Sequence, residues 1–394
     1  MKERKAADGF NPEAMLEQVI LKVRSNRKRF DALHAPGVAV EGSYSRRLGT
    51  LYSMDQWTLS FFTGMAIHAY NYAGNSGDLE WVLRQQDDYR KKVADYALDT
   101  MHDLGFLYSL SQVALYRSTG NREAREIGLL AATELAKRFS VNGKYIDAWS
   151  RMDRTDEEIA GLMIIDCMMN LPLLFWAWQE TGHCFYREVA EAHADTTLRF
   201  LVREDHSVRH AFKFHRITGI PDGERNHCGF GVGSAWARGT AWAMYGFAVA
   251  YRYTGKAVYL EEAKQIAEFF LLQLPESGIP VWDFRLPPGA PPLVDTSACA
   301  IAACALLELS EIEGADGEEG SVLKAGGTAD GQYGKQAAAM LAALSAPPYC
   351  AAASGEECVL HLAQCGSGQA GAIWGDYFYM EGLLRLMGKA VIFW

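Results

Sequence analysis

The sequence lacks the motifs that mark the common cofactor sites. It contains no GxxxxGK[ST], HExxH or GxSxG, and its GFGVGS stretch at 229–234 does not fit the GxGxxG dinucleotide fingerprint. Its eight cysteines include no CxxC pair, which argues against a zinc or redox motif and favours reduced thiols in cytoplasm. The sequence therefore indicates no metal or organic cofactor.

A basic excess and an N-terminal apolar run are also absent. The 394 residues include 38 Lys and Arg against 48 Asp and Glu, whereas nucleic-acid-binding domains are usually basic. Residues 1–15 resemble neither a signal peptide nor a membrane span. The apolar segment 159–178 approaches the length of a membrane helix, but Asp166, Asn170 and Pro172 interrupt it. We therefore expect a cytoplasmic protein with neither nucleic-acid nor membrane partners.

A weak internal repeat runs along the chain. In each copy an apolar helix ends at a glycine and a charged, amphipathic helix follows. The four turn glycines are Gly74, Gly120, Gly182 and Gly255. Glycine suits the residue after a helix C-terminus, which often has a positive φ. The repeat predicts αα-hairpins in which the first helix is buried and the second faces solvent.

Twelve helices are predicted in total, enough for six hairpins. Their expected ranges are 12–32, 57–74, 79–98, 103–119, 121–139, 170–181, 185–202, 235–254, 258–273, 295–312, 334–345 and 375–388. Six hairpins can close into an all-α (α/α)6 barrel, here a single catalytic domain over residues 1–394. An open α-solenoid that binds proteins is the alternative. The Gly-rich stretch 313–333 is expected to be an exposed loop.

Polar and aromatic residues precede the apolar helices and would meet at one cavity mouth. They are Asp55, Trp57, His102, Asp103, Asp166, Trp236, Arg238, Trp242, Asp295 and Asp376. Each Asp alone is more often a helix N-cap, so the prediction depends on their number. Tryptophans could provide flat faces for sugar rings, although each could equally be a core residue. The tryptophans considered for this role are Trp57, Trp149, Trp236 and Trp242.

Asp166 is the most distinctive of these residues because apolar side chains flank it over 162–169. Loss of hydration raises the pKa of a carboxyl group, and the charge of Asp103 is expected to raise that of Asp166 further. Two carboxyl groups with separated pKa values fit the cleavage of sugar linkages. A buried Asp satisfied by backbone amides is the alternative. Arg238 needs an acceptor if buried, and a ligand carboxylate would serve.

Several motifs occur together along most of the chain. They are WTLSFFTGM at 57–65, HDLGF at 102–106, IIDCMMNLPLLFWA at 164–177, DHSVRHAFKF at 205–214, SAWARGTAWAMYGF at 234–247 and GDYFYMEGLLRL at 375–386. Jointly they resemble the unsaturated glucuronyl hydrolases, glycoside hydrolase family 88. The resemblance implies an intracellular (α/α)6 enzyme that removes the terminal 4,5-unsaturated uronic acid from oligosaccharides left by polysaccharide lyases. It also implies that no metal or organic cofactor is needed.

The resemblance further implies roles for individual residues. Asp166 would protonate C4 of the ring double bond and activate the water that adds at C5, with Asp103 as its partner. The implied substrate-binding residues are Trp57, Trp149, His210, Cys228, Trp236, Arg238, Trp242, Ser367 and Gln369. Cys228 stands where many relatives have Gln. Gln369 carries no charge for a sulfate group, so we expect a preference for unsulfated or differently sulfated disaccharides.

Two other functions are compatible with the sequence. Unsaturated rhamnogalacturonyl hydrolases share the barrel and the hydration chemistry but act on pectin fragments. A non-catalytic helical scaffold or oligosaccharide-binding protein is the other alternative, but it leaves an Asp inside the apolar run 162–169 unexplained. The protein is expected to be a monomer or a homodimer.

Overall fold

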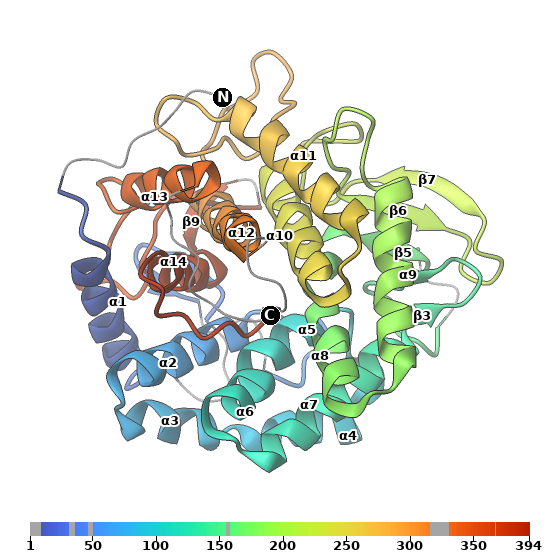
Figure 1. The fold of residues 1–394 in the computed structure, drawn as a ribbon, viewed down its shortest axis with the longest axis horizontal. Helices are drawn as coiled ribbons and strands as arrows, with labels where there is room; N and C mark the ends of the chain where they lie inside the picture. Colours follow the sequence, from blue (N-terminus) through green and yellow to red (C-terminus); the bar gives the residue numbers. More distant parts are fainter. Residues whose placement is uncertain (1–8, 31–35, 46–49, 155–157, 316–330, 367) are drawn as a thin grey trace.

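Helices form two layers around a central axis (Figure 1). The computed structural model describes residues 9–30, 36–45, 50–154, 158–315, 331–366 and 368–394. The inner layer consists of α2 (Leu59–Ala73), α5 (Leu104–Tyr108) with its π-helical continuation (Ser109–Val113) into α6 (Ala114–Thr119), α8 (Leu171–Thr181), α10 (Ala237–Thr254), α12 (Thr296–Ala315) and α14 (Ile373–Leu386). The outer layer consists of α1 (Pro12–Asn26), α3 (Ser76–Leu83), α4 (Gln86–Asp95), α7 (Arg122–Lys137), α9 (Cys184–Phe200), α11 (Ala257–Gln273) and α13 (Gln332–Leu344).

The helix α1 closes the ring. It contacts α14, the last inner helix, and α2, the first (Figure 1). Its apolar side chains Leu16, Val19 and Val23 are buried in the core shared with these helices. Because the two ends of the helical series meet, the (α/α)6 prediction is confirmed and the open solenoid is wrong.

The four glycine turns form as the sequence predicts. Each glycine has a φ between 66° and 72°, and its N–H donates to the carbonyl four residues earlier at 2.7 Å. Asn75 and Asn121 follow two of these glycines and cap the next helix by accepting from a backbone N–H. The hairpin turns therefore need glycine for its left-handed conformation.

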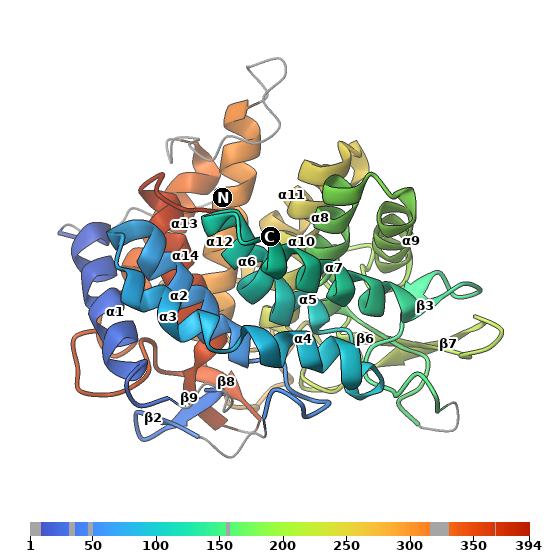
Figure 2. The same ribbon diagram turned by 90° about the horizontal axis from the view of Figure 1, so that it is seen from below.

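Short strands lie along the lower and right-hand edges of the helical ring in Figure 2. One sheet has the order β2-β1-β9-β8 and consists of β1 (Val38–Val40), β2 (Ser43–Tyr44), β8 (Ala363–Cys365) and β9 (Gly368–Ala372). A second has the order β5-β6-β7, with β5 (Leu162–Ile164), β6 (Ala211–Phe214) and β7 (Pro221–Arg225). A small ribbon pairs β3 (Phe139–Ser140) with β4 (Tyr145–Ile146). The sequence analysis missed these strands, which are too short to show a clear alternation.

Two expectations about segments change, and the expected division of a third segment is confirmed. The helix expected at 79–98 is broken at Arg84 and Gln85 into α3 and α4. The loop expected at 313–333 is shorter, because α12 continues to Ala315 and α13 begins at Gln332; residues 316–330 lie outside the described residues. The apolar segment 159–178 divides into β5, a 3-10 helix (Ile165–Met169) and the first part of α8. No helix in the described part of the chain is long and apolar enough to cross a membrane.

The glycine turns give a direct test of this account. Gly182 has a φ of 70°, and an added Cβ would meet nothing within 4 Å. We predict that Gly182→Ala lowers the free energy of unfolding by about 1 kcal/mol through backbone strain alone. Urea unfolding measures this loss. The control is Gly355→Ala, since Gly355 has equal space and no positive φ; equal losses in both variants would contradict the account.

Candidate functional site

A cavity of about 640 Å³ lies among the N-terminal ends of the inner helices, on the side of the ring where the strands gather. Most of the residues that the sequence places at one mouth meet here. The lining residues are Val38, Met54, Asp55, Gln56, Trp57, Thr58, Met101, His102, Asp103, Trp149, Ile159, Asp166, His210, Cys228, Trp236, Arg238, Cys365, Gly366 and Trp374. Aromatic rings and carboxyl groups thus line the same cavity.

Antiparallel pairing of β5 and β6 sets Asp166 beside His210. Ile164 pairs with Ala211, and the N–H of Ile165 donates to the carbonyl of His210 at 3.0 Å. Asp166 follows on the 3-10 helix, so its Oδ2 lies 3.8 Å from Nε2 of His210. Two residues that are 44 positions apart in the sequence are therefore held together by a strand pair.

Asn170 connects the two carboxyl-bearing segments. Its Oδ1 accepts from the N–H of Phe106 at 2.7 Å, and its Nδ2 donates to Asp103 Oδ1 at 3.4 Å and to the carbonyl of Asp166 at 3.3 Å. This close approach depends on Gly105, because an added Cβ there would lie 2.3 Å from Cα of Asn170. The glycine of the HDLGF motif thus serves to bring Asp103 next to the Asp166 segment.

Arg138 fixes another wall of the cavity. This buried C-cap of α7 donates to the backbone carbonyls of Thr100, Asp147, Ala148 and Ser150. Residues 100 and 147–150 are thereby joined, which positions Trp149 on one side and His102 and Asp103 on the other. Burial lowers the pKa of Arg138 to about 10, so the guanidinium keeps its charge at neutral pH. The sequence analysis missed Arg138 because nothing distinguishes it from an ordinary basic residue in the last turn of a helix.

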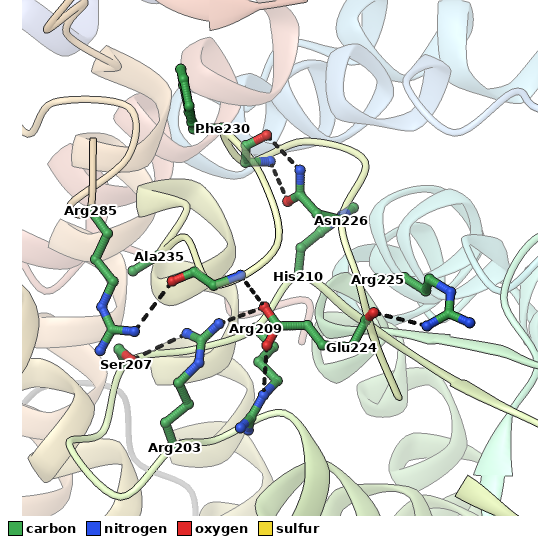
Figure 3. Close-up of polar contacts among 12 residues, drawn as sticks. Arg203, Ser207, Arg209, His210, Glu224, Arg225, Asn226, Phe230, Ala235 and Arg285 are labelled. Atoms are coloured by element: carbon green, nitrogen blue, oxygen red, sulfur yellow. Dashed lines mark hydrogen bonds and ion pairs between the residues drawn. The ribbon is translucent and has the colours of Figure 1, made fainter. Parts of the chain in front are cut away.

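Glu224 stabilises the loop that carries Cys228. Figure 3 shows its polar contacts. Its carboxylate accepts from Arg203 at 2.6 Å, from Arg209 at 3.0 Å and from the N–H of Gly233 at 2.8 Å. Within the loop, the Asn226 side chain exchanges two hydrogen bonds with the backbone of Gly229. The loop therefore has a fixed shape where it contributes to the cavity wall.

The two carboxyl groups differ in exposure and in acidity. Side-chain exposure is 8% for Asp103 and 21% for Asp166. Burial raises the pKa of Asp103 to about 8, with a further rise from the charge of Asp166. Burial raises the pKa of Asp166 to about 6, and the positive charge of Arg238 limits that rise. The sequence analysis expected repulsion between the two groups to raise the pKa of Asp166. In the structure it raises the pKa of Asp103 instead, because the Asp103 side chain is less exposed and the charge of Arg238 lowers the pKa of Asp166.

His210 is neutral, and its Nε2 faces Asp166 at 3.8 Å, too far for a hydrogen bond. Its Nδ1 accepts from the N–H groups of His227 at 3.0 Å and Cys228 at 3.3 Å, and burial lowers its pKa to about 3. A neutral ring that accepts at Nδ1 carries its proton on Nε2. Neither His210 Nε2 nor Asp166 Oδ2 has a hydrogen-bond partner among the described residues. Both atoms therefore keep unused hydrogen-bonding capacity in side chains that line the cavity.

Arg238 finds its main acceptors inside the protein. Its Nη1 donates to Asp295 at 2.7 Å, to Ser297 at 3.1 Å and to the carbonyl of Gln364 at 3.0 Å. Its guanidinium also lies 4.6 Å from the ring centroid of Trp236. The sequence analysis suggests a ligand carboxylate as an acceptor; in the structure Nη1 pairs with Asp295, and contact with a ligand carboxylate stays a prediction. Arg238 still lines the cavity and still lowers the pKa of Asp166.

Two predicted binding residues lie outside the cavity lining. Trp242 is 1% exposed and packs in the core against Phe106 and Phe378, so it belongs to the core and not to the cavity wall. The Gln369 amide donates to the carbonyl of Val294 at 2.7 Å, which commits it to the backbone. Neither placement supports direct substrate contact, which stays a prediction for both residues. Ser367 lies outside the described residues.

Other mouth residues have structural roles, and one aromatic residue was missed. Asp295 caps α12 by accepting from the N–H groups of Ser297 and Ala298. The Asp376 carboxylate accepts from Tyr44 and from two backbone N–H groups, so it anchors a loop.

Trp374, which the sequence analysis missed, lines the cavity 4.9 Å from the ring of Trp57. Its position just before the GDYF motif is the signal that could have revealed it.

The fold and cavity define a class of protein. A helical toroid with aromatic walls and two carboxyl groups of raised and unequal pKa is the arrangement expected of a sugar-cleaving enzyme. The chain is accordingly a glycoside hydrolase, and comparisons with known proteins identify its family.

The chain is 37% identical to the unsaturated glucuronyl hydrolase of Bacillus sp. strain GL1 over 344 residues, which cover 86% of this chain and 88% of the relative. It is 34% identical to the unsaturated chondroitin disaccharide hydrolase of Streptococcus pyogenes serotype M1, over 84% of this chain and 81% of the relative. No protein-family model matches the chain. At this identity and coverage, the chain belongs to the unsaturated glucuronyl hydrolases.

Solved structures agree with this assignment. The crystal structure of the Bacillus sp. GL1 enzyme has a TM-score of 0.84 at 35% identity and covers 95% of this chain and 97% of its own. A variant of the Streptococcus agalactiae unsaturated glucuronyl hydrolase complexed with dGlcA-GalNAc6S has a TM-score of 0.77 at 26% identity, with both chains fully covered.

The raised pKa of Asp103 predicts a dependence of stability on pH. With a pKa near 8 in the folded state against an ordinary 3.8, folding binds a proton between about pH 4 and pH 8. The free energy of unfolding of the wild type should therefore fall as pH rises through this window. Asp103→Asn removes the titrating group. The free energy of unfolding of this variant minus that of the wild type should therefore increase by roughly 1–4 kcal/mol from pH 4 to pH 8.

Urea unfolding at several pH values measures this change. The control is Asp87→Asn on the exposed side of α4, whose stability difference from wild type should stay within about 0.5 kcal/mol. A difference between Asp103→Asn and wild type that is constant with pH would contradict the assignment.

Proposed function

We propose that the protein removes the terminal 4,5-unsaturated uronic acid from glycosaminoglycan-type disaccharides by hydrating the C4–C5 double bond. One observation carries this proposal: Asp166 has a pKa near 6, lines the cavity, and its Oδ2 has no hydrogen-bond partner among the described residues. Such a group can give a proton to a substrate atom and take one back at neutral pH. The relatives described above, named for the same chemistry, support the proposal.

In the proposed reaction, the Asp166 carboxyl group transfers its proton to C4 of the unsaturated ring. Positive charge then develops at C5 and the ring oxygen. Water adds at C5 and loses a proton to the Asp166 carboxylate, which restores the acid. The resulting hemiketal opens, and the bond to the remaining sugar breaks. Every proton taken from the enzyme is returned within the cycle.

Asp103 and His210 would assist without changing charge. With a pKa near 8, Asp103 is mostly protonated at neutral pH, so it places no second negative charge beside Asp166. The Nε2–H of His210 faces Asp166 and can donate to a substrate oxygen in the cavity. The indole N–H groups of Trp236 and Trp374 also lack partners among the described residues, and both side chains line the cavity. They are further donors for sugar or carboxylate oxygens.

The cysteines bear on the location of the protein. All eight cysteines lie within the described residues and none forms a disulfide, which is compatible with the cytoplasmic location proposed here. A monomer or homodimer stays a prediction, as does a single domain over residues 1–394.

Replacing Asp166 tests the proposed acid. We predict that Asp166→Asn lowers kcat by about 10²-fold to 10⁴-fold or more, because the amide cannot supply the proton. The assay is the loss of ultraviolet absorbance of the conjugated double bond in unsaturated chondroitin, hyaluronan, heparin and pectin disaccharides, with and without sulfate. The melting temperature should be retained, which excludes misfolding. Near wild-type turnover by this variant would rule out Asp166 as the donor, and faster turnover of the pectin disaccharides would favour the rhamnogalacturonyl alternative.

The pH profile provides an independent test. Since Asp166 must be protonated to react, kcat/KM should fall about tenfold per pH unit above a pKa near 6. Initial rates between about pH 4 and pH 9 measure this limb. A profile that stays flat from pH 5 to pH 8 would contradict a proton donor of this acidity.

A further inference from the structure

Three potential metal ligands cluster in the segment between α13 and β8. A carboxylate oxygen of Glu356, Sγ of Cys358 and a ring nitrogen of His361 all lie within 4.8 Å of one another. Cys358 Sγ is 3.7 Å from Glu356 Oε2 and 3.9 Å from His361 Nδ1, and Glu356 Oε2 is 3.1 Å from His361 Nε2. Bond lengths in a tetrahedral zinc site imply ligand atoms roughly 3.3–3.6 Å apart. Cys358 Sγ and Glu356 Oε2 are near that spacing. His361 approaches Cys358 through Nδ1 and Glu356 through Nε2, so rotation of the partly exposed His361 or Glu356 side chain would bring one ring nitrogen into a common ligand set.

The backbone that carries these side chains is fixed from two directions. The Lys22 ammonium donates to the backbone carbonyls of Ala351, Glu356 and Cys358, at 2.6, 2.8 and 2.9 Å. The Asp376 carboxylate accepts from the N–H groups of Val359 and Leu360, both at 2.8 Å. The segment is thus held in shape by contacts that do not use the three candidate ligands, so little ordering would be needed for an ion to bind.

The chemistry of the set favours one class of ion. A thiol, an imidazole and one carboxylate suit zinc and similar divalent transition metals, whereas calcium and magnesium require several oxygen ligands. Cys358 is buried, while the Glu356 and His361 side chains are 39% and 31% exposed, so an ion can enter from solvent. The carboxylates of Glu356 and Asp376 offset the nearby positive charge of Lys22.

We propose that Glu356, Cys358 and His361 bind a zinc-class divalent ion, with water as the fourth ligand. On binding, the Cys358 S–H bond is replaced by a sulfur–metal bond, and the proton is released to solvent. None of the three residues lines the cavity, so the proposal is independent of the proposed function. The ion would tie residues 356 and 361 together just before β8, whose last residue, Cys365, lines the cavity.

Cobalt is the probe, because a cobalt–thiolate bond gives a charge-transfer band in the near ultraviolet. Titrating the chelator-treated full chain with Co²⁺ should produce this band with one equivalent, and Zn²⁺ should then remove it. Cys358→Ser should abolish the band. His361→Ala, at a partly exposed position, should weaken Co²⁺ binding by about 100-fold or more while leaving the fold intact. The matched control Cys184→Ser, at an exposed thiol on α9, should bind as wild type does.

Thermal unfolding gives a second readout. Zn²⁺ should raise the melting temperature of the wild type and of Cys184→Ser, but not that of Cys358→Ser or His361→Ala. No band in the wild type, or a band that persists in Cys358→Ser, would overturn the proposal. An equal zinc-induced shift in all four proteins would overturn it as well.

Discussion

The site depends on the cost of placing two carboxyl groups where water is scarce. A buried carboxylate loses hydration, which raises the pKa of both groups, and the charge of Asp166 raises the pKa of Asp103 further. The protein limits this effect unequally. The charge of Arg238 lowers the pKa of Asp166, whereas the hydrogen bond from Asn170 and the charge of Arg138 lower that of Asp103. The result is one carboxyl group poised near neutrality and one kept largely protonated.

The fold produces this arrangement through close backbone approaches. Gly105 lets the start of α5 contact Asn170, and Gly246 lets α10 contact the 3-10 helix, since an added Cβ there would lie 2.5 Å from Met168 Cβ. The pairing of β5 with β6 then sets His210 against Asp166. Glycine positions and a short strand pair therefore determine the geometry of the acidic groups, while the helical ring supplies the enclosed and apolar surroundings.

Much of the ring could be predicted from the sequence, because its signals are local. The glycine turns and the amphipathic second helices predict the hairpins, and the hairpins predict the ring. The position of Asp166 inside an apolar run predicts its raised pKa. What could not be predicted depends on tertiary contacts. Whether Trp242 faces the cavity or the core, and that Asp295 neutralises Arg238, are decided by neighbours far along the chain.

The protonation state of Asp166 is the central quantity of this account, and infrared difference spectroscopy of the free enzyme measures it directly. The carbonyl stretch of a protonated carboxyl group, assigned by its absence in Asp166→Asn, should disappear with a midpoint near pH 6. A midpoint near pH 4, the ordinary value for an aspartate in water, would contradict the claim that the cavity holds this group as an acid.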